Sequence, residues 1–587
     1  MNRLVQRTLE NRGYSRAFLR EINDPFYDKL HNIDEFAVIM KQAHDEGTVI
    51  TVFPDYDVDG ISAGTTFFAG LSELGFCVNL FIPDSTRNYG VSVESVDDIM
   101  SVYPDTKIIV TCDTGISAYG AARRCRDIGV MFIVTDHHIQ ECAIDASLVV
   151  NPMSFGETYS HPDICGAFVV YQCLQYYADL YCNYFLQDQI RRLRVFAGIG
   201  TISDAMPLLY ENRQVVLDAV RILRIVYGNG AFDSVMSIPG CDIYKKAFWG
   251  LFYSLSVFEK YGSIHGQSDI NEEFIGFYFA PVFNSNKRLG GDMNRAFGVF
   301  FSNDQSADME YLYAMNVKRK SVVEQALHDI KSRDYETVED GSVVKSQGNK
   351  YAPYVYLSDA GSGILGLLAT KLMEETGVPT FVIADDGENC ADGRYHGSGR
   401  TPSWYPRKTA LAAVSSPGDA QLVHFGGHQH AFGIGIDDES KLDAFVDFLR
   451  SDVPRVMSKL TISDTEPVYD FVISTDWTAD TGIDVELFFD YLSEIENYRP
   501  FGKGFPAPVV KLVFHDDDVI DWKVIGRAKE HLKIMFGNGF DVLCWNQAGY
   551  ISNKGTDVCE HVVIGHLGMS EYKGAISVNF TGVIHSL

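Results

Sequence analysis

The stretch TVITVFPDYDVDGISAG, residues 48–64, decides the fold of this chain. It opens with apolar, β-branched residues, passes through three alternate aspartates, and ends in small residues that suit the first turn of a helix. A buried strand followed directly by a helix is the repeating unit of a parallel α/β sheet. In such sheets the ligand site lies beyond the carboxyl ends of the strands, which is where these aspartates fall.

Apolar segments on either side of this stretch extend the same pattern. Further strands are expected at 107–112, 131–135 and 147–151, with helices at 61–74 and 116–127. Helices are also expected before the first strand. Uniformly apolar strands that alternate with helices predict a parallel sheet covered on both faces.

The rest of the chain predicts three further parts. Residues 306–334 lack Pro and Gly and predict a long connecting helix, and a second strand–helix pattern begins near residue 353. Short alternating strands near the carboxyl end are typical of a small β-barrel, here an OB-fold. The expected domains are a parallel-sheet α/β domain with N-terminal helices (1–280), a connector with the long helix (281–340), a second α/β domain (341–455) and the barrel (456–587).

Composition limits the classes of function. The chain has 587 residues, with 78 acidic against 49 basic side chains and a net charge of −29. This acidity argues against broad non-specific DNA binding, which usually needs a basic surface. It does not exclude a metal-dependent nuclease, because carboxylates that hold cations also add negative formal charge.

The chain is expected to be cytoplasmic, with no membrane partner. No apolar run approaches the roughly 18 residues of a membrane span, and the first residues do not resemble a signal peptide. The 11 cysteines are scattered and form no paired metal-binding motif. Buried, reduced thiols are the expected state of such cysteines.

Asp55, Asp57 and Asp59 form the first chemical motif. Like charges at alternate positions after a buried strand repel one another, and a bound cation relieves that repulsion. Alternate residues of an extended backbone point the same way, so the three carboxylates can converge on one ion. A calcium-like loop or a solvated acidic turn would give the same pattern.

Later strands and helices end in further ionisable residues. Asp113 follows the second expected strand, the run Asp136-His137-His138 follows the third, and Asp204 follows an apolar helix. Taken singly, these could be a helix cap or histidines satisfied within the core. Together they give an oxygen-rich site with imidazole nitrogen, which suits Mn²⁺ or Mg²⁺ better than structural Zn²⁺. Two such ions about 3.5–4 Å apart can hydrolyse phosphate esters.

The motifs DxDxDG, CDxG, DHH and GTxxD, in this order, resemble the DHH phosphoesterase superfamily. That superfamily includes RecJ exonucleases, phosphodiesterases of short RNA and cyclic dinucleotides, and family II inorganic pyrophosphatases. The pyrophosphatases have a ligand histidine where this chain has Phe53, which disfavours that branch. The resemblance implies two metal ions, with Asp113 bridging them, His138 contacting the scissile phosphate and Asp136 orienting a histidine. The other implied metal ligands are Asp55, Asp57, Asp59, His137 and Asp204.

Segments of the second half resemble RecJ and its DHH-associated domain. They are NSNKRLG at 284–290, GSGILG at 361–366, GSGR at 397–400, GGH at 426–428 and RPFG at 499–502. Exposed amides, a hydroxyl and a guanidinium in GSGR are chemically suited to hold a phosphate, although a glycine turn with a surface arginine would look the same. The implied substrate-binding residues are Arg288, Ser398, Arg400, Gly426, Gly427 and His428.

The resemblance therefore implies a metal-dependent 5′→3′ exonuclease of single-stranded DNA in DNA repair and recombination. Single-stranded DNA is the expected partner, with a single-strand-binding protein or a helicase as further partners. One alternative is a phosphodiesterase for short RNA or cyclic dinucleotides. Another is a non-enzymatic scaffold related to RecJ, which would have lost metal ligands that are all present here.

Overall fold

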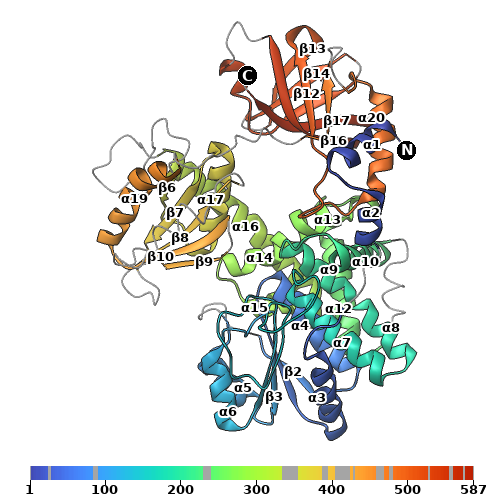
Figure 1. The fold of residues 1–587 in the computed structure, drawn as a ribbon, viewed down its shortest axis with the longest axis vertical. Helices are drawn as coiled ribbons and strands as arrows, with labels where there is room; N and C mark the ends of the chain where they lie inside the picture. Colours follow the sequence, from blue (N-terminus) through green and yellow to red (C-terminus); the bar gives the residue numbers. More distant parts are fainter. Residues whose placement is uncertain are drawn as a thin grey trace. The chain divides into compact units, whose positions relative to one another are not determined.

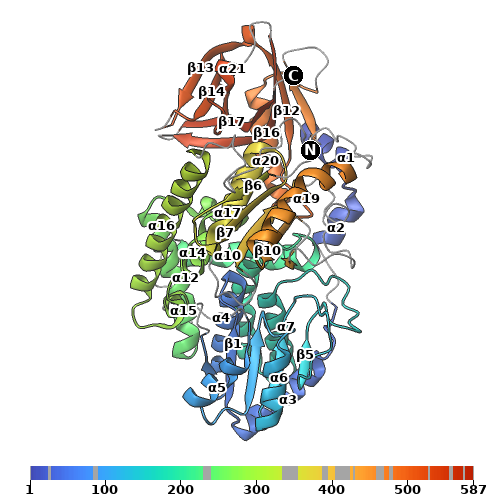
Figure 2. The same cartoon turned by 90° about the vertical axis from the view of Figure 1, so that its left-hand side faces the viewer.

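The chain folds into two compact units (Figure 1, Figure 2). The computed structural model describes residues 2–23, 28–82, 90–228, 239–332, 354–385, 394–402, 424–427, 430–457, 469–474, 480–526, 529–537, 539–553, 559–572 and 575–585. The larger unit consists of Lys29–Asp204 and Asp218–Asp464. The smaller one combines Met1–Asp28, Ala205–Leu217 and Thr465–Leu587.

The first sheet of the larger unit is entirely parallel, as predicted. Its strand order is β2-β1-β3-β4-β5. The sequence did not indicate β2, which has three half-buried residues at the sheet edge. The strands are β1 (Ile50–Pro54), β2 (Val78–Leu80), β3 (Ile108–Cys112), β4 (Met131–Thr135) and β5 (Leu148–Val150).

Helices cover both faces of this sheet. Figure 1 shows α5 (Val93–Val102) and α6 (Tyr119–Ile128) on one side and α3 (Ile33–Glu46) and α7 (Gly166–Tyr181) on the other. The central helix α4 (Val58–Glu73) packs on β1 and against α7, and it is buried along most of its length. Because no face of the sheet meets water, the strands are uniformly apolar rather than alternating.

Further helices pack beyond this sheet. The predicted connecting helix is α16 (Gln305–Ser332), and it packs along α12, α14 and α15. A short π-helix, η2 (Ile275–Phe279), runs directly into α14. The helices are α8 (Tyr184–Arg192), α9 (Arg194–Ser203), α10 (Tyr210–Tyr227), α12 (Asp242–Lys260), η1 (Gln267–Asp269), α13 (Glu272–Phe274), α14 (Ala280–Arg288) and α15 (Met293–Phe301).

The second sheet of the larger unit is mixed. Its order is β6-β7-β8-β10-β9, and only the β6–β7 pair is parallel. Leu368 of α17 packs on one face together with α16, and Phe445 of α19 packs on the other. The elements are β6 (Tyr354–Leu357), α17 (Ser362–Thr376), β7 (Thr380–Asp385), β8 (Tyr395–Arg400), β9 (His424–Gly427), β10 (Ala431–Ile436) and α19 (Glu439–Met457).

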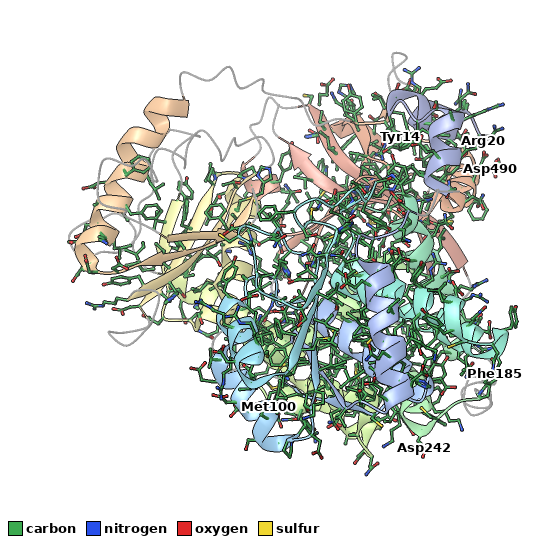
Figure 3. The ribbon with its side chains drawn as sticks, turned by 60° about the horizontal axis from the view of Figure 1, so that its bottom comes forward. Tyr14, Arg20, Met100, Phe185, Asp242 and Asp490 are labelled. Carbon is green, nitrogen blue, oxygen red and sulfur yellow. The ribbon has the colours of Figure 1, made fainter. Side chains whose placement is uncertain are left out.

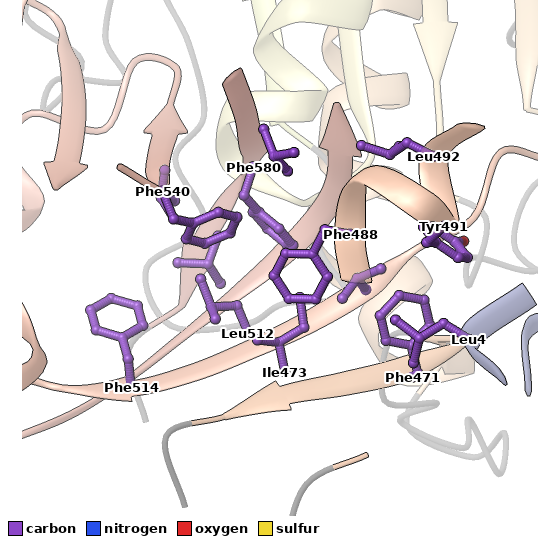
Figure 4. Packing of buried hydrophobic residues seen from close by; sticks show 14 of the residues in the cluster. Leu4, Phe471, Ile473, Phe488, Tyr491, Leu492, Leu512, Phe514, Phe540 and Phe580 are labelled. Carbon is purple, nitrogen blue, oxygen red and sulfur yellow. The ribbon is translucent and has the colours of Figure 1, made fainter. Parts of the chain in front are cut away.

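The smaller unit is built on one seven-stranded sheet of order β11-β12-β16-β17-β15-β14-β13. Strands β11 and β13 are the two edges of this sheet, and among the described strands they do not pair to close a barrel. The sheet is nevertheless compatible with the expected OB-fold. Phe488 and Tyr491 of α20 enter its apolar core (Figure 4). The elements are β11 (Phe471–Ser474), α20 (Val485–Ile495), η3 (Glu496–Tyr498), β12 (Val510–His515), η4 (Asp516–Asp518), β13 (Val519–Ile525), β14 (His531–Phe536), β15 (Asp541–Cys544), α21 (Tyr550–Asn553), β16 (Glu560–Tyr572) and β17 (Ala575–His585).

The N-terminal helices belong to this smaller unit and not to the first domain, where the sequence had placed them. Leu4, Val5 and Leu9 of α1 (Arg3–Asn11) are buried in the core shared with α20, and Leu4 is visible there in Figure 4. Helix α2 (Arg16–Asn23) follows in the same unit. An apolar helix face shows that a helix packs against something, but not against which distant segment.

Single apolar side chains such as Phe185 stand at the surface of the larger unit (Figure 3). Scattered exposure of this kind is ordinary in globular proteins. No described helix combines the length and hydrophobicity that a bilayer crossing demands.

Arg213 joins three segments of the smaller unit. Its side chain is fully buried and donates hydrogen bonds to the carbonyl oxygens of Tyr498 (2.6 Å), Arg499 (2.9 Å) and Pro500 (2.9 Å). Its Nε donates to the side-chain oxygen of Asn23 at 2.8 Å. A buried guanidinium that satisfies several carbonyls is costly to remove, because those carbonyls then lose their partner.

We expect Arg213→Met to lower the free energy of unfolding of the smaller unit by about 3 kcal/mol or more. Denaturant unfolding monitored by tryptophan fluorescence would measure the change. Arg7→Met is the matched control in the same unit, because the Arg7 side chain is 52% exposed and pairs with Asp480. The control should change stability by about 0.5 kcal/mol at most. Equal effects of the two substitutions would contradict the clamping role of Arg213.

Candidate metal centre

The predicted acids and histidines converge at the carboxyl ends of β1, β3 and β4. In three groups, the nearest ligand atoms lie within 4.8 Å of one another. Asp113 and His137 each belong to two groups, so the three groups form one continuous cluster. The groups are Asp55, Asp57 and Asp113; Asp59, His137 and Asp204; and Asp113, His137 and His138.

The turn after β1 fixes the first three carboxylates. Asp57 caps the start of α4, where its side chain accepts a hydrogen bond from the Gly60 amide at 3.0 Å. Asp55 and Asp59 are buried on either side of it. Gly60 passes so close to Asp55 that an added Cβ would lie 2.5 Å from the Asp55 carbonyl. The tight turn therefore requires glycine at position 60.

Asp113 lies at the centre of the cluster. Its backbone adopts a φ of 63°, a left-handed conformation that Asp and Asn tolerate better than most residues. Its carboxylate is 2% exposed, and its Oδ1 has no hydrogen-bond partner. Burial and the charges of the neighbouring aspartates raise the pKa of Asp113 well above its ordinary value. A bound cation would stabilise a buried carboxylate that repels its neighbours.

His137 brings nitrogen to this group of oxygens. Its Nε2 lies 3.2 Å from Asp113 Oδ1, 3.6 Å from Asp204 Oδ2 and 3.9 Å from Asp59 Oδ2. Burial lowers the pKa of His137, against the opposing pull of the aspartates. A neutral imidazole keeps the lone pair that a metal ligand needs.

Asp136 orients His138 rather than joining the cluster. Its Oδ1 accepts hydrogen bonds from the amides of His137 (2.7 Å) and His138 (3.1 Å), and lies 2.7 Å from Nδ1 of His138. Its Oδ2 accepts from the Ile116 amide at 2.9 Å. Burial lowers the pKa of His138, but the bond with Asp136 and the nearby acids outweigh it and raise the pKa to about 9. The His138 side chain is half exposed.

Asp204 ends α9, where the exposed backbone carbonyls carry partial negative charge. An acid is disfavoured at that end of a helix unless a cation lies nearby. Asp204 lies beside His137 and Asp59 in one of the three groups of possible metal ligands. Carboxylate and imidazole groups gathered around a buried oxygen without a donor fit hard divalent cations such as Mn²⁺ or Mg²⁺.

A second cluster, of positive charge, lies in the same unit. Arg288 ends α14, Arg319 lies on α16 and Arg400 ends β8. Burial lowers the pKa of Arg288, and the charges of Arg319 and Arg400 lower it further, while Asp57 opposes them. The three guanidinium groups repel one another, and a bound anion would relieve that repulsion. In the same way, a bound cation would relieve the repulsion among the acids.

Small residues line up beside these arginines. Ser398 on β8 pairs with Gly433 on β10, and Gly433 pairs in turn with Gly426 on β9. Gly427 follows on β9, and His428 lies outside the described residues. In α17, an added Cβ at Gly366 would lie 2.7 Å from the Arg400 guanidinium and 3.4 Å from Ser398 Oγ. The structure thus brings Arg288, Ser398 and Arg400 together around the start of α17.

Sequence reasoning missed two basic residues at these clusters. The Lys287 ammonium lies 3.8 Å from the Tyr56 ring centroid, and the charges of Asp55 and Asp57 act on it. Lys287 stands beside Arg288 in a motif already singled out, so it could have been found. Arg319 lies in a helix without any motif, and only folding brings it near Arg288.

One cavity of the larger unit lies elsewhere, among α7, α8, α9, α10 and α12. It has a volume of about 750 Å³ and is lined by Tyr171, Phe248 and several Arg–Asp pairs. None of the candidate metal ligands lines it, so this cavity is separate from the metal centre.

We expect Asp113→Asn to stabilise the metal-free protein at pH 8, raising the melting temperature by a few degrees. The raised pKa of Asp113 means that the folded state binds its proton more tightly than the unfolded state, whose carboxyl has the ordinary value of 3.8. Stability from this group therefore falls as the pH rises above that value. The advantage of the variant should shrink as the pH is lowered.

Melting curves in EDTA and in Mn²⁺ at several pH values test this expectation. In Mn²⁺ the order should reverse, because the wild-type protein alone gains the full stabilisation from bound ion. A variant that melts below the wild-type protein in EDTA at pH 8 would show that Asp113 is not electrostatically strained.

Known families match the chain in three segments. Residues 49–196 match the DHH family, N-terminal domain. Residues 349–453 match the DHHA1 domain, and residues 483–581 match the RecJ OB domain.

Similar proteins extend along most of the chain. The single-stranded-DNA-specific exonuclease RecJ of Bacillus subtilis (strain 168) is 27% identical over 546 residues, which are 91% of this chain and 61% of that protein. The protein of the same name from Salmonella typhimurium is 24% identical over 580 residues, which are 93% of this chain and 90% of that protein. The chain thus spans about three fifths of the length of the Bacillus relative.

A solved structure shows the same fold. The crystal structure of RecJ in complex with Mn²⁺ from Thermus thermophilus has a TM-score of 0.71 and 22% sequence identity. The match covers 100% of this chain and 76% of that chain. Three domain matches in order, relatives along nine tenths of the sequence and this shared fold show that the chain is a RecJ-like member of the DHH superfamily.

Proposed function

We propose that this protein is a metal-dependent exonuclease that hydrolyses single-stranded DNA in the 5′→3′ direction, in DNA repair and recombination. Its relatives are named single-stranded-DNA-specific exonucleases, and one solved relative is a complex with Mn²⁺. The observation that carries the proposal is the pairing of two clusters of opposite charge. Arg288 of the arginine cluster lies within the electrostatic influence of Asp57 of the acid cluster.

The acid cluster would hold two Mn²⁺ or Mg²⁺ ions. One group of ligands consists of Asp59, His137 and Asp204, and the other of Asp55, Asp57 and Asp113. Asp113 would be a ligand next to both groups, because its Oδ1 lies 3.2 Å from Nε2 of His137. Such ions supply Lewis-acid activation of the scissile phosphate and of the attacking water.

His138 would contact the scissile phosphate. Its imidazole is held by Asp136 and half exposed, so it can donate a hydrogen bond to a phosphate oxygen. Asp136 would act through His138, fixing the orientation and the charge of the ring.

The arginine cluster would bind the terminal 5′ phosphate of the strand. Arg288, Arg319 and Arg400 supply charge, Ser398 supplies a hydroxyl, and α17 begins at Ser362, after the N-cap residue Gly361, with no side-chain cap on its amides. Charge-assisted hydrogen bonds from guanidinium groups are strong and directional. A terminal phosphate fixed beside the metal site places a bond near the strand end at the ions, so cleavage removes nucleotides from that end. Gly426, Gly427 and His428 would complete the contacts to the strand.

A phosphodiesterase for short RNA or cyclic dinucleotides would use the same metal chemistry. The match to the RecJ OB domain over 483–581 favours a longer strand, which such a domain can bind by stacking and charge. The domain limits at residues 280, 340 and 455, the cytoplasmic location and the partnership with a single-strand-binding protein or helicase stay predictions.

We expect the purified protein with Mn²⁺ to digest long single-stranded DNA to mononucleotides, much faster than duplex DNA or dinucleotides. Gel analysis of single-stranded, duplex, RNA and dinucleotide substrates, with label at either end, measures both preference and polarity. EDTA should abolish the digestion. An intact single-stranded substrate with rapid cleavage of dinucleotides would instead support the phosphodiesterase alternative.

We expect Arg400→Ala to lower kcat/KM on a 5′-phosphorylated strand about tenfold or more, which equals about 1.4 kcal/mol. The preference for a 5′ phosphate over a 5′ hydroxyl should be lost at the same time. Arg394→Ala is the control, because Arg394 lies near the start of the same strand and pairs with Asp385 instead. A phosphate preference that survives Arg400→Ala would contradict the proposed clamp.

A further inference from the structure

The first turn of α7 reaches into the candidate metal centre. The amides of Gly166 and Ala167 donate hydrogen bonds to the two carboxylate oxygens of Asp59, at 2.7 Å to Oδ2 and 3.1 Å to Oδ1. Asp59 comes from the turn after β1, 107 residues before Gly166 in the chain. Both bonds are buried, so they fix the direction in which the carboxylate points.

The same turn comes close to Asp113. A Cβ added at Gly166 would lie 2.4 Å from Asp113 Oδ1, which is closer than real Cβ contacts allow. That Oδ1 is the buried oxygen without a hydrogen-bond partner. Because glycine has no Cβ, position 166 leaves the space in which the Asp113 carboxylate lies.

A second glycine does the same for Asp59. A Cβ added at Gly200, near the end of α9, would lie 2.1 Å from Asp59 Oδ1 and 2.9 Å from the Ala167 Cβ. Neither glycine has a positive φ, so backbone freedom does not explain why glycine occurs there. Two glycines and two amides thus surround the carboxylates of Asp59 and Asp113, which repel each other.

We propose that the first turn of α7, together with Gly200, is the positioning element of the metal centre. It holds Asp59 through two amides and leaves room for Asp59 and Asp113 to stand side by side, where a shared cation can bind both. This inference rests on the proposed function. Gly166, Ala167 and Gly200 are positioning residues, since they act through the two carboxylates.

Binding of Mn²⁺ alone, without DNA, tests the proposal on the full chain. We expect Gly166→Ala to weaken Mn²⁺ binding about tenfold or more in isothermal titration calorimetry, because residues that orient ligands typically matter to that degree. Gly120→Ala is the matched control, since Gly120 also lies in the first turn of a helix and its added Cβ would meet only the Val93 side chain at 3.3 Å. The control should bind Mn²⁺ as the wild-type protein does.

Ala167→Pro tests the loss of one of the two amide donors. Proline removes the amide that donates to Asp59 Oδ1 and is tolerated in the first turn of a helix. We expect weaker Mn²⁺ binding by this variant too, while cooperative unfolding in EDTA persists. This variant decides the question if Gly166→Ala does not fold.

The outcomes distinguish this inference from the proposed function. Wild-type affinity for Mn²⁺ in the folded variants would overturn the positioning role and leave the proposed exonuclease untouched. A wild-type protein that binds no Mn²⁺ at all would instead overturn the proposed function.

Discussion

Mutual repulsion of buried carboxylates is the constraint on which the rest of this structure depends. Asp55, Asp59 and Asp113 are nearly inaccessible to water, and Asp113 has an oxygen without a donor. Such an arrangement is unfavourable in a folded protein unless positive charge enters it. The parallel sheet creates the problem by ending adjacent strands at one edge, and the same edge provides the ligands that two divalent ions need.

The second cluster mirrors the first. Arg288, Arg319 and Arg400 repel one another as the aspartates do, and they lie near the start of α17, whose first amides have no side-chain cap. The acids would favour bound cations, and the arginines would favour a phosphate group. Under the proposed function, a strand end carrying phosphate and metal would neutralise both clusters at once, which would link binding of the end to cleavage beside it.

The sequence predicted the features that depend on residues close together in the chain. The strand, the acidic turn and the helix of residues 48–64 were predictable because burial, repulsion and helix initiation all act within a few residues. The packing partner of α1 was not predictable, because an apolar helix face does not show which distant segment covers it. Arg319 and Gly166 escaped notice for the same reason: their significance arises only when folding brings α16 beside α14 and the first turn of α7 beside Asp59 and Asp113.

The most direct measurement is the anomalous scattering of Mn²⁺ in crystals of the full chain grown with the metal. We expect two peaks about 3.5–4 Å apart at the edge of the first sheet, with a carboxylate oxygen of Asp113 between them. His137 should contact one of the two ions. Peaks elsewhere, or none within reach of Asp113, would contradict the two-metal centre.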